Sequence, residues 1–102
     1  MTELFVERSF QAPNGQVLAR FERPYLAPGG EYRCRWRIVG LGADRGKETA
    51  GIDSVQALML AMKVVQAELS ESDEYKAGKL TYLEQTDLDL PSLYDAGPSP
   101  TE

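Results

Sequence analysis

The sequence predicts a single α+β domain in which one long helix packs on one face of an antiparallel sheet of about four strands, in the order β-β-β-(β)-α-β. Three observations predict this class. Residues 32–39 alternate between apolar and charged side chains, residues 53–70 repeat apolar side chains at helical spacing, and an Asn-Gly pair separates two β-rich segments. A chain of 102 residues suits one domain with one core.

The first two strands are predicted to form a hairpin. Residues 4–10 are rich in β-formers, and residues 17–23 alternate after the pair Asn14-Gly15. Both residues of that pair tolerate positive φ, which favours a tight turn at this point. One face of the second strand carries the apolar residues Val17, Ala19 and Phe21.

Residues 32–39 are the clearest strand. Strict alternation of this kind is typical of a strand with one face on the core and one face in water. The core face carries Tyr32, Cys34, Trp36 and Ile38, and the opposite face carries Arg33, Arg35 and Arg37. The glycine-rich segment that follows, 40–51, is predicted to be loose, with residues 47–50 extended.

The helix is predicted to begin at Asp53. An aspartate at this position accepts hydrogen bonds from the free N–H groups of the first turn, and Gln56 stands where the side chain of a capping box reaches back. We expect both residues to have a structural role. The core face of the helix is predicted to carry Val55, Leu58, Met62, Val65 and Leu69, widened by Ala57, Ala61 and Val64.

A last short strand is predicted at residues 79–83, after which the composition changes. The domain is therefore expected to span residues 1–84. From residue 85 the chain is rich in Asp, Pro, Ser and Gly, which is typical of a flexible segment. Residues 85–102 are expected to form an acidic, mostly flexible tail that docks, if at all, near Leu90-Pro91.

The composition argues against several kinds of chemistry. The chain has no histidine, so the commonest general base and the commonest zinc ligand are missing. Its single cysteine, Cys34, lies on the predicted core face, where a thiol is inert. The glycine-rich turn at 40–46 lacks the helix that must directly follow a dinucleotide-binding turn. We therefore predict no enzymatic activity, no cofactor and no metal.

The location and the class of partner are predicted from the same composition. The longest apolar stretch, 55–69, is interrupted by polar residues and is too short to cross a bilayer. Residues 1–5 lack the basic start of a signal peptide, so the cytoplasm is the expected location. The net charge of −5 argues against nucleic acid as the main partner, although it does not exclude a local basic stripe.

Two stretches of the sequence carry a family resemblance: Tyr32-Arg33-Cys34-Arg35-Trp36-Arg37-Ile38-Val39-Gly40 and Gly51-Ile52-Asp53-Ser54-Val55-Gln56-Ala57-Leu58. The later elements are Gly78-Lys79-Leu80-Thr81-Tyr82 and Leu90-Pro91. In this layout, over roughly residues 4–91, the chain is similar to a family of short bacterial proteins of unknown function. The resemblance implies a stand-alone bacterial domain, and it implies no activity.

A stripe of arginines is the sharpest surface feature of the predicted sheet. Side chains on one face of a strand follow one another at intervals of about 7 Å. The stripe consists of Arg33, Arg35 and Arg37, which Arg20 and Arg8 could join from neighbouring strands. This face is a candidate site for an anionic partner, such as an acidic protein segment or nucleic acid. In the alternative interpretation the face is solvated, and the arginines pair across strands with Glu7 and Glu22.

The sequence favours a non-enzymatic interaction domain that binds a protein partner or a second copy of itself. One helix covers only part of one sheet face, so the uncovered face or a free sheet edge is available for contact. The alternative function is binding of nucleic acid or another anion at the face that carries Arg33, Arg35 and Arg37.

Overall fold

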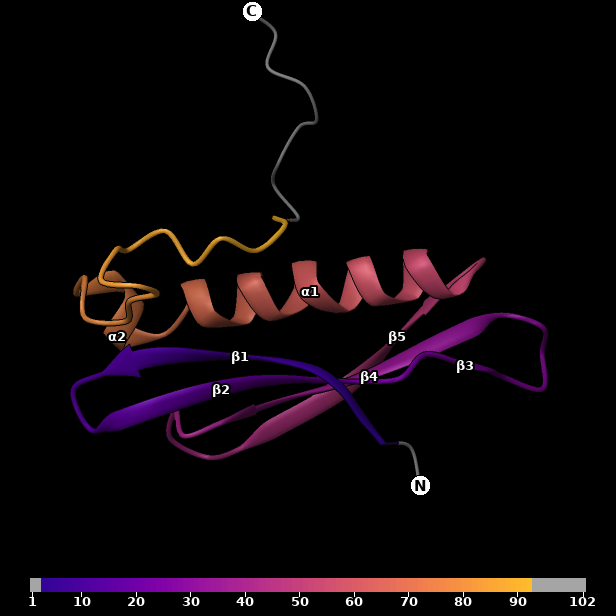
Figure 1. The fold of residues 1–102 in the computed structure, drawn as a ribbon, viewed down its shortest axis with the longest axis horizontal. Helices are drawn as coiled ribbons and strands as arrows, with labels where there is room; N and C mark the ends of the chain where they lie inside the picture. The colour runs from indigo at the N-terminus through magenta and orange to yellow at the C-terminus, as the bar shows by residue number, and fades with distance from the viewer. Residues whose placement is uncertain (1–2, 93–102) are drawn as a thin grey trace, which may run out of the picture.

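The computed structural model of the chain describes residues 3–92 (Figure 1). One long helix lies on one face of an antiparallel sheet, which confirms the predicted α+β class. The elements are β1 (Leu4–Ala12), β2 (Gly15–Glu22), β3 (Tyr25–Leu26), β4 (Tyr32–Val39), β5 (Arg45–Gly51), α1 (Ser54–Ser70) and α2 (Asp73–Lys76). No helix among residues 3–92 has the length and hydropathy needed to cross a membrane.

Strands β1 and β2 form the predicted hairpin, but its turn lies one residue earlier than expected. Ala12 pairs with Gly15, so the two turn residues are Pro13 and Asn14. Gly15 has a φ of 126°, whereas Asn14 has an ordinary negative φ. The reason is Pro13, whose ring fixes a φ near −65° and suits the first position of the turn.

The sheet is a meander centred on β4. Strands β2 and β3 follow one another along one edge of β4, while β5 pairs along the other edge. The segment predicted to be extended at 47–50 is the middle of β5, which pairs with β4 over its whole length. The alternation of β4 is also as predicted, because Cys34, Trp36 and Ile38 are buried.

Two polar contacts hold the start of α1. The side chain of Asp53 accepts a hydrogen bond from the backbone N–H of Gln56 at 2.8 Å. The side chain of Gln56 reaches back one residue further than in a capping box and accepts from the backbone N–H of Ile52 at 2.7 Å. Both side chains therefore satisfy N–H groups that the helix itself leaves free.

The buried row of α1 differs from the predicted one. It consists of Ala57, Ala61, Val65 and Leu69. Val55, predicted to lie on the core face, is 64% exposed. The cause is a close approach to β5, because a Cβ atom at Gly51 would lie 2.6 Å from the backbone nitrogen of Ala57. The contact fixes the rotation of the helix with its alanines against the sheet, and Thr49 Oγ1 donates to Ala57 O at 2.8 Å.

The chain after α2 returns over β1 and completes the layer that covers the sheet (Figure 1). Helix α1 packs mainly on β4 and β5, so β1 needs another cover. The expected strand at 79–83 is reduced to one bridge between Gln11 and Thr81, followed by a tight turn in which Tyr82 pairs with Gln85. Leu80 is fully buried near this bridge.

The described part of the predicted tail, residues 85–92, packs on the domain. Leu88 is only 1% exposed and belongs to the core, and Leu90 packs against the core. Arg8 of β1 donates hydrogen bonds to the carbonyl oxygens of Leu88 and Asp89 at 3.2 and 2.6 Å. The domain therefore extends past the boundary predicted at residue 84. The rest of the predicted tail, 93–102, lies outside the described residues.

Candidate functional site

The sheet face opposite α1 brings the predicted arginines together. The alternation of β4 places three of them on this face, and Arg20 of β2 lies directly opposite Arg37. We call this surface the arginine face; it consists of Arg20, Arg33, Arg35 and Arg37.

Most of the arginine face is paired with carboxylates. Arg20 Nε lies 2.8 Å from an oxygen of Glu7, as the solvated interpretation predicted. Arg33 pairs with Glu31 at 2.7 Å and with Glu48 at 3.0 Å, and Arg35 Nε lies 3.2 Å from the second oxygen of Glu48. Glu22, the other carboxylate weighed from the sequence, makes no ion pair among residues 3–92.

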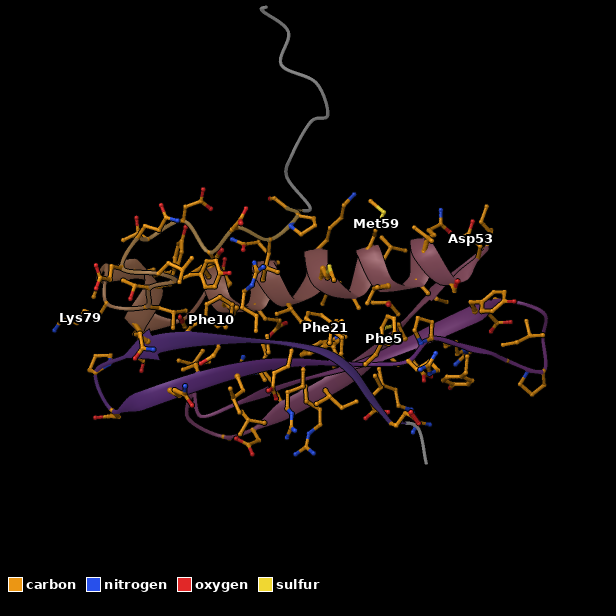
Figure 2. All side chains as sticks on the ribbon, viewed as in Figure 1. Phe5, Phe10, Phe21, Asp53, Met59 and Lys79 are labelled. Carbon is orange, nitrogen blue, oxygen red and sulfur yellow. The ribbon has the colours of Figure 1, made fainter. Side chains whose placement is uncertain are left out.

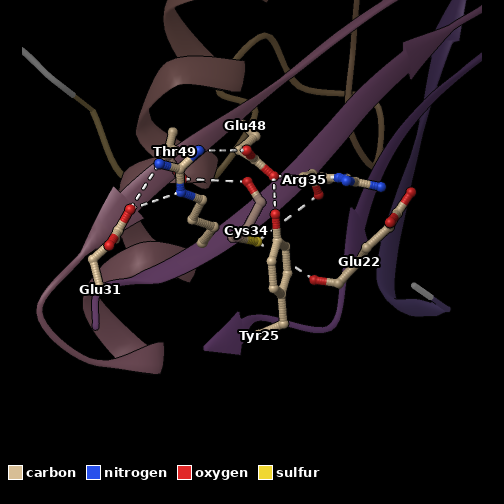
Figure 3. A network of polar contacts seen from close by, with 8 residues as sticks. Glu22, Tyr25, Glu31, Cys34, Arg35, Glu48 and Thr49 are labelled. Atoms are coloured by element: carbon tan, nitrogen blue, oxygen red, sulfur yellow. Dashed lines mark hydrogen bonds and ion pairs between the residues drawn. The ribbon is translucent and has the colours of Figure 1, made fainter. Parts of the chain in front are cut away.

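Glu48 of β5 is the centre of this network (Figure 3). Its carboxylate accepts hydrogen bonds from the Tyr25 hydroxyl at 2.7 Å and from both Arg33 and Arg35. These donors hold the pKa of Glu48 below its ordinary value. The hydrogen bond from the Tyr25 hydroxyl to Glu48 also raises the pKa of Tyr25. The Arg33 guanidinium likewise lowers the pKa of Glu31. The network therefore joins side chains of β3, β4 and β5 on one surface.

Arg37 differs from the other three, because it makes no ion pair within residues 3–92. It lines a shallow depression of about 450 Å³ together with Arg35, Lys47, Glu22 and Glu48. The two glutamates offset most of the positive charge of the three basic residues in this lining. Four glutamates thus accompany the four arginines of the face, and the positive potential that the sequence suggests is largely neutralised.

Arg8 does not join the arginine face, although the sequence allowed it. It stands two residues from the buried Phe10, so it lies on the face of β1 that the C-terminal segment covers. Its guanidinium lies 4.3 Å from the centre of the Tyr82 ring and binds the two carbonyl oxygens described above. Arg8 therefore fastens the C-terminal segment to the sheet.

Cys34 is buried in the core, as the alternation predicted. Burial raises the pKa of its thiol to about 11, and the thiol lies 3.4 Å from the carbonyl oxygen of Glu22. A thiol of this kind is protonated at neutral pH and unreactive.

A second surface, which the sequence did not indicate, is a groove between α1 and β1. We call it the apolar groove; its walls are Phe5, Pro24, Tyr32, Val55 and Leu58, with Arg23 and Ser54 at its rim. Its volume is about 430 Å³. Phe5 is the extra residue of a β-bulge in β1, between residues that pair in register with β2. Such a bulge re-aims a side chain, so no alternation pattern could have placed Phe5 here.

A separate depression of about 290 Å³ lies beside the docked C-terminal segment. Its apolar side is lined by Val6, Phe21, Met62, Leu90 and Pro91. Figure 2 shows Phe10 and Phe21 between the sheet and α1.

Other large apolar side chains are exposed around the same end of the molecule. Ile52, directly before the helix, is 81% exposed, and Met59, one helical turn after Val55, is 44% exposed. Met59 points away from the sheet in Figure 2. Leu26 of β3 is also exposed, and it pairs with Tyr32 of the groove wall. This end of the molecule is therefore apolar beyond the groove itself.

The described residues offer little for catalysis or for holding a metal. Among residues 3–92, no group of three or more Cys, Asp or Glu side chains is placed to hold a metal ion, and no polar or charged side chain is buried. Such side chains are the ones whose pKa values shift far enough for catalysis.

The comparisons with known proteins return one family. A model of a domain of unknown function, DUF6968, matches residues 6–92. Neither the search of curated proteins nor the search of solved structures finds a match. The matched residues include the arginine face, the docked segment up to Ser92 and every residue of the apolar groove except Phe5.

Proposed function

The chain belongs to the DUF6968 family of domains of unknown function, as the sequence resemblance led us to expect, and we propose that it is a non-enzymatic interaction domain. It binds a protein partner at the apolar groove. The observation that carries this proposal is the groove itself, with large apolar side chains exposed along its wall and around its end. Bacterial origin and a cytoplasmic location stay predictions from the sequence.

Exposed apolar surface of this kind supports partner binding. Val55 and Phe5 are 64% and 44% exposed, and covering the rest of each side chain removes apolar surface from water, which favours a complex by about 25 cal/mol per Å² covered. Large apolar side chains gathered in one place on a small domain are typical of an interaction site, whereas single exposed leucines are common anywhere. Leu83, at the opposite end of the molecule, is such a single leucine.

Catalysis is left out of the proposal for a chemical reason. The sequence contains no histidine, and the residues that line the groove include no carboxylate and no cysteine. The groove has hydroxyls at Tyr32 and Ser54, but none of its lining residues is a histidine, carboxylate or lysine that could act as the base to activate them. No cofactor is proposed on the same ground.

The test compares two exposed apolar residues at opposite ends of the helical layer. Val55→Asp places a charge in the groove, and Leu83→Asp places the same charge outside it at a side chain that is 73% exposed. We expect proteins captured by the tagged wild-type chain to be depleted at least tenfold on Val55→Asp and retained on Leu83→Asp. Equal capture by all three chains, at equal melting temperatures, would contradict the proposal.

Self-association is a separate outcome of the same proposal, because a second copy could be the partner. Light scattering after size-exclusion chromatography measures the mass of each variant. A wild-type dimer that Val55→Asp converts to a monomer assigns the groove to a second copy. A monomer in all variants assigns the groove to another protein.

Anion binding at the arginine face is a second candidate, and one observation favours it. Arg37 has no ion pair within residues 3–92 and lines an open depression beside Arg35. If this face binds nucleic acid, titration at low salt gives an affinity that falls with rising salt and is lost on Arg35→Glu. An absence of binding at low salt removes this candidate.

A further inference from the structure

Strand β5 forms a free edge of the sheet. It pairs with β4 along its whole length, and no other strand of the described residues lies on its outer side. Every second residue of such a strand directs both its N–H and its carbonyl oxygen outward. Gln11 of β1 directs its backbone groups outward to Thr81. Alternation from there across β2 and β4 places the outward groups of β5 at Gly46, Glu48 and Ala50, where no other backbone group of the described chain binds them.

Two cations flank the first half of this edge, one on each face of the sheet. Lys47 lies opposite the buried Trp36, so it is on the side of the helix. Arg37 lies opposite Gly46 on the arginine face, and a Cβ atom at Gly46 would lie 2.9 Å from Arg37 Cγ. Because Gly46 has no side chain, the stem of Arg37 lies against β5. Neither cation makes an ion pair within the described part of the chain.

The carboxylates closest to these cations are engaged elsewhere or lie across the sheet. Glu48 accepts hydrogen bonds from the three donors described above. Asp44 accepts from a backbone N–H in the turn before β5 at 3.2 Å, and Glu68 of α1 pairs with Arg45 at 3.0 Å. Glu22 belongs to β2, which lies on the far side of β4 from this edge. The edge therefore keeps one cation without an acidic partner on each face.

We propose that the free edge of β5 binds an extended acidic segment of a partner protein as an added strand. The segment exchanges backbone hydrogen bonds with the outward groups of β5, which is a common mode of peptide recognition. Neighbouring side chains of a strand point to opposite faces, so two adjacent acidic residues reach Arg37 on one face and Lys47 on the other. This edge shares no residue with the apolar groove, so the inference goes beyond the proposed function.

Charge argues against a second copy of β5 as the occupant. Two copies related by a twofold axis pair antiparallel, and like charges directly opposite one another destabilise such a pair. A register centred on Glu48 places this residue opposite itself, and a register centred on Lys47 does the same with the lysine. A register centred on Thr49 leaves Gly46, and with it Arg37, outside the paired stretch. An acidic segment instead places opposite charges beside both cations.

The test uses the full chain and the peptide acetyl-Thr-Val-Glu-Asp-Val-Thr-amide, which is rich in β-formers and carries two adjacent acids. Amide hydrogen exchange of β5 is followed by NMR as the peptide is added to millimolar concentration. We expect a saturable slowing at Gly46, Glu48 and Ala50, whose N–H groups donate to the added strand. The amides of Lys47 and Thr49 face β4 and should keep their rates.

Two kinds of modified peptide separate charge from backbone pairing. The peptide in which Gln and Asn replace Glu and Asp should bind about tenfold more weakly, because both ion pairs are lost. N-methylation of alternate residues leaves one edge of the peptide able to pair and should preserve binding. N-methylation of every residue removes the donors of both edges and should abolish the slowing. Equal binding by the uncharged or the fully methylated peptide would overturn the proposal.

Three matched variants test the two cations. Lys47→Gln and Arg37→Gln should each weaken peptide binding about twofold to fivefold, the range of an exposed ion pair. Lys79→Gln, at an exposed lysine outside the sheet that also lacks an ion pair, should leave the affinity unchanged. Equal weakening in all three variants would mean that binding follows net charge alone, which contradicts a site at this edge.

Two further outcomes would overturn the proposal. One is an absence of slowing at millimolar peptide. The other is a short oligothymidylate that shifts the signals of Arg37 and Lys47 when the acidic peptide does not, which would assign these cations to nucleic acid. Val55→Asp changes only the apolar groove, so it should bind the acidic peptide as the wild type does. Failure at the edge and failure of the proposed function are therefore seen separately.

Discussion

The two halves of α1 belong to the same helix and cover the same sheet, yet one half is closed and the other is open. In the C-terminal half, Val65 and Leu69 are fully buried, with Leu80 and Leu88 in the same core. In the N-terminal half, Val55 is exposed beside the apolar groove. The difference is the segment from Lys79 to Ser92, which lies beside the C-terminal half only (Figure 1).

The comparison teaches that one helix is too narrow to cover this sheet. Helix α1 packs on β4 and β5, and a second cover is needed over β1 and β2. The C-terminal segment provides that cover as far as Pro91, and the groove is the part of the sheet layer that remains. The open half therefore begins where the C-terminal segment stops covering the sheet, at Pro91.

The largest expected effect is a difference in the free energy of unfolding between a variant of the closed half and a variant of the open half. Leu88→Ala in the closed half should lower the free energy of unfolding by about 2–5 kcal/mol, because it removes a fully buried side chain. Val55→Ala in the open half should change it by less than about 0.5 kcal/mol. Urea unfolding measures both values. Similar losses in the two variants would mean that the halves are equally packed.

The next largest effect is a gain in the free energy of unfolding, expected when backbone strain in the closed half is relieved. Leu83 and Glu84 have φ values of 51° and 69°, and the tight turn between Tyr82 and Gln85 favours Asn and Gly at these positions. Leu83→Asn combined with Glu84→Gly should raise the free energy of unfolding by about 1 kcal/mol. Leu26→Asn, at an exposed leucine with ordinary φ, is the control and should give no gain.

A loss of similar size is expected at the open half, where Asp53 caps the helix. Asp53→Ala removes the hydrogen bond to the N–H of Gln56 and should lower the free energy of unfolding by about 1 kcal/mol. Asp53→Asn keeps an acceptor and should lose only a fraction of that. Thermal unfolding measures both, and binding to the groove should survive in each. An unchanged melting temperature for Asp53→Ala would contradict its role as the helix cap.

The smallest effect concerns the arginine face, which lies behind both halves. The pKa values of Glu48 and Glu31 are lowered, so their contribution to stability is present above pH 4.5, the ordinary value, and is lost as pH falls through the lower folded value. Glu48→Gln should therefore lose less stability than the wild type between about pH 5 and pH 3. Glu84→Gln removes a carboxylate that accepts none of these hydrogen bonds, and it is the matched control.

Local patterns predicted the elements of the fold that depend on local periodicity. The alternation in residues 32–39 gives β4 with its correct buried face, and Asp53 marks the residue before α1. Membership of a domain family of unknown function was also predicted correctly. Each of these depends on residues close together in the sequence, where side-chain spacing carries the information.

The features that the sequence did not reveal depend on contacts between distant residues. The rotation of α1 is fixed by the approach of Gly51 to Ala57, which no periodicity contains, so Val55 was placed in the core. The groove joins Phe5, Tyr32 and Val55 from three separate elements. The stripe of arginines was visible, but two of its partners were not weighed. The position of Glu48 follows from the pairing of β4 with β5, whereas Glu31 lies only two residues before Arg33, so the sequence offered that pair and it was missed.

The hydrogen bond from Arg8 to the carbonyl oxygen of Leu88 also has a consequence for the order in which the chain folds. These residues are 80 positions apart, so their contact closes a loop that contains nearly the whole domain. Contacts of such long sequence separation form late, because closing the loop orders the chain before any contact is gained. During synthesis β1 leaves the ribosome before the segment that covers it. Phe10 therefore lacks this cover until Leu80 and Leu88 have been made, and the aggregation risk of the nascent domain is concentrated on β1.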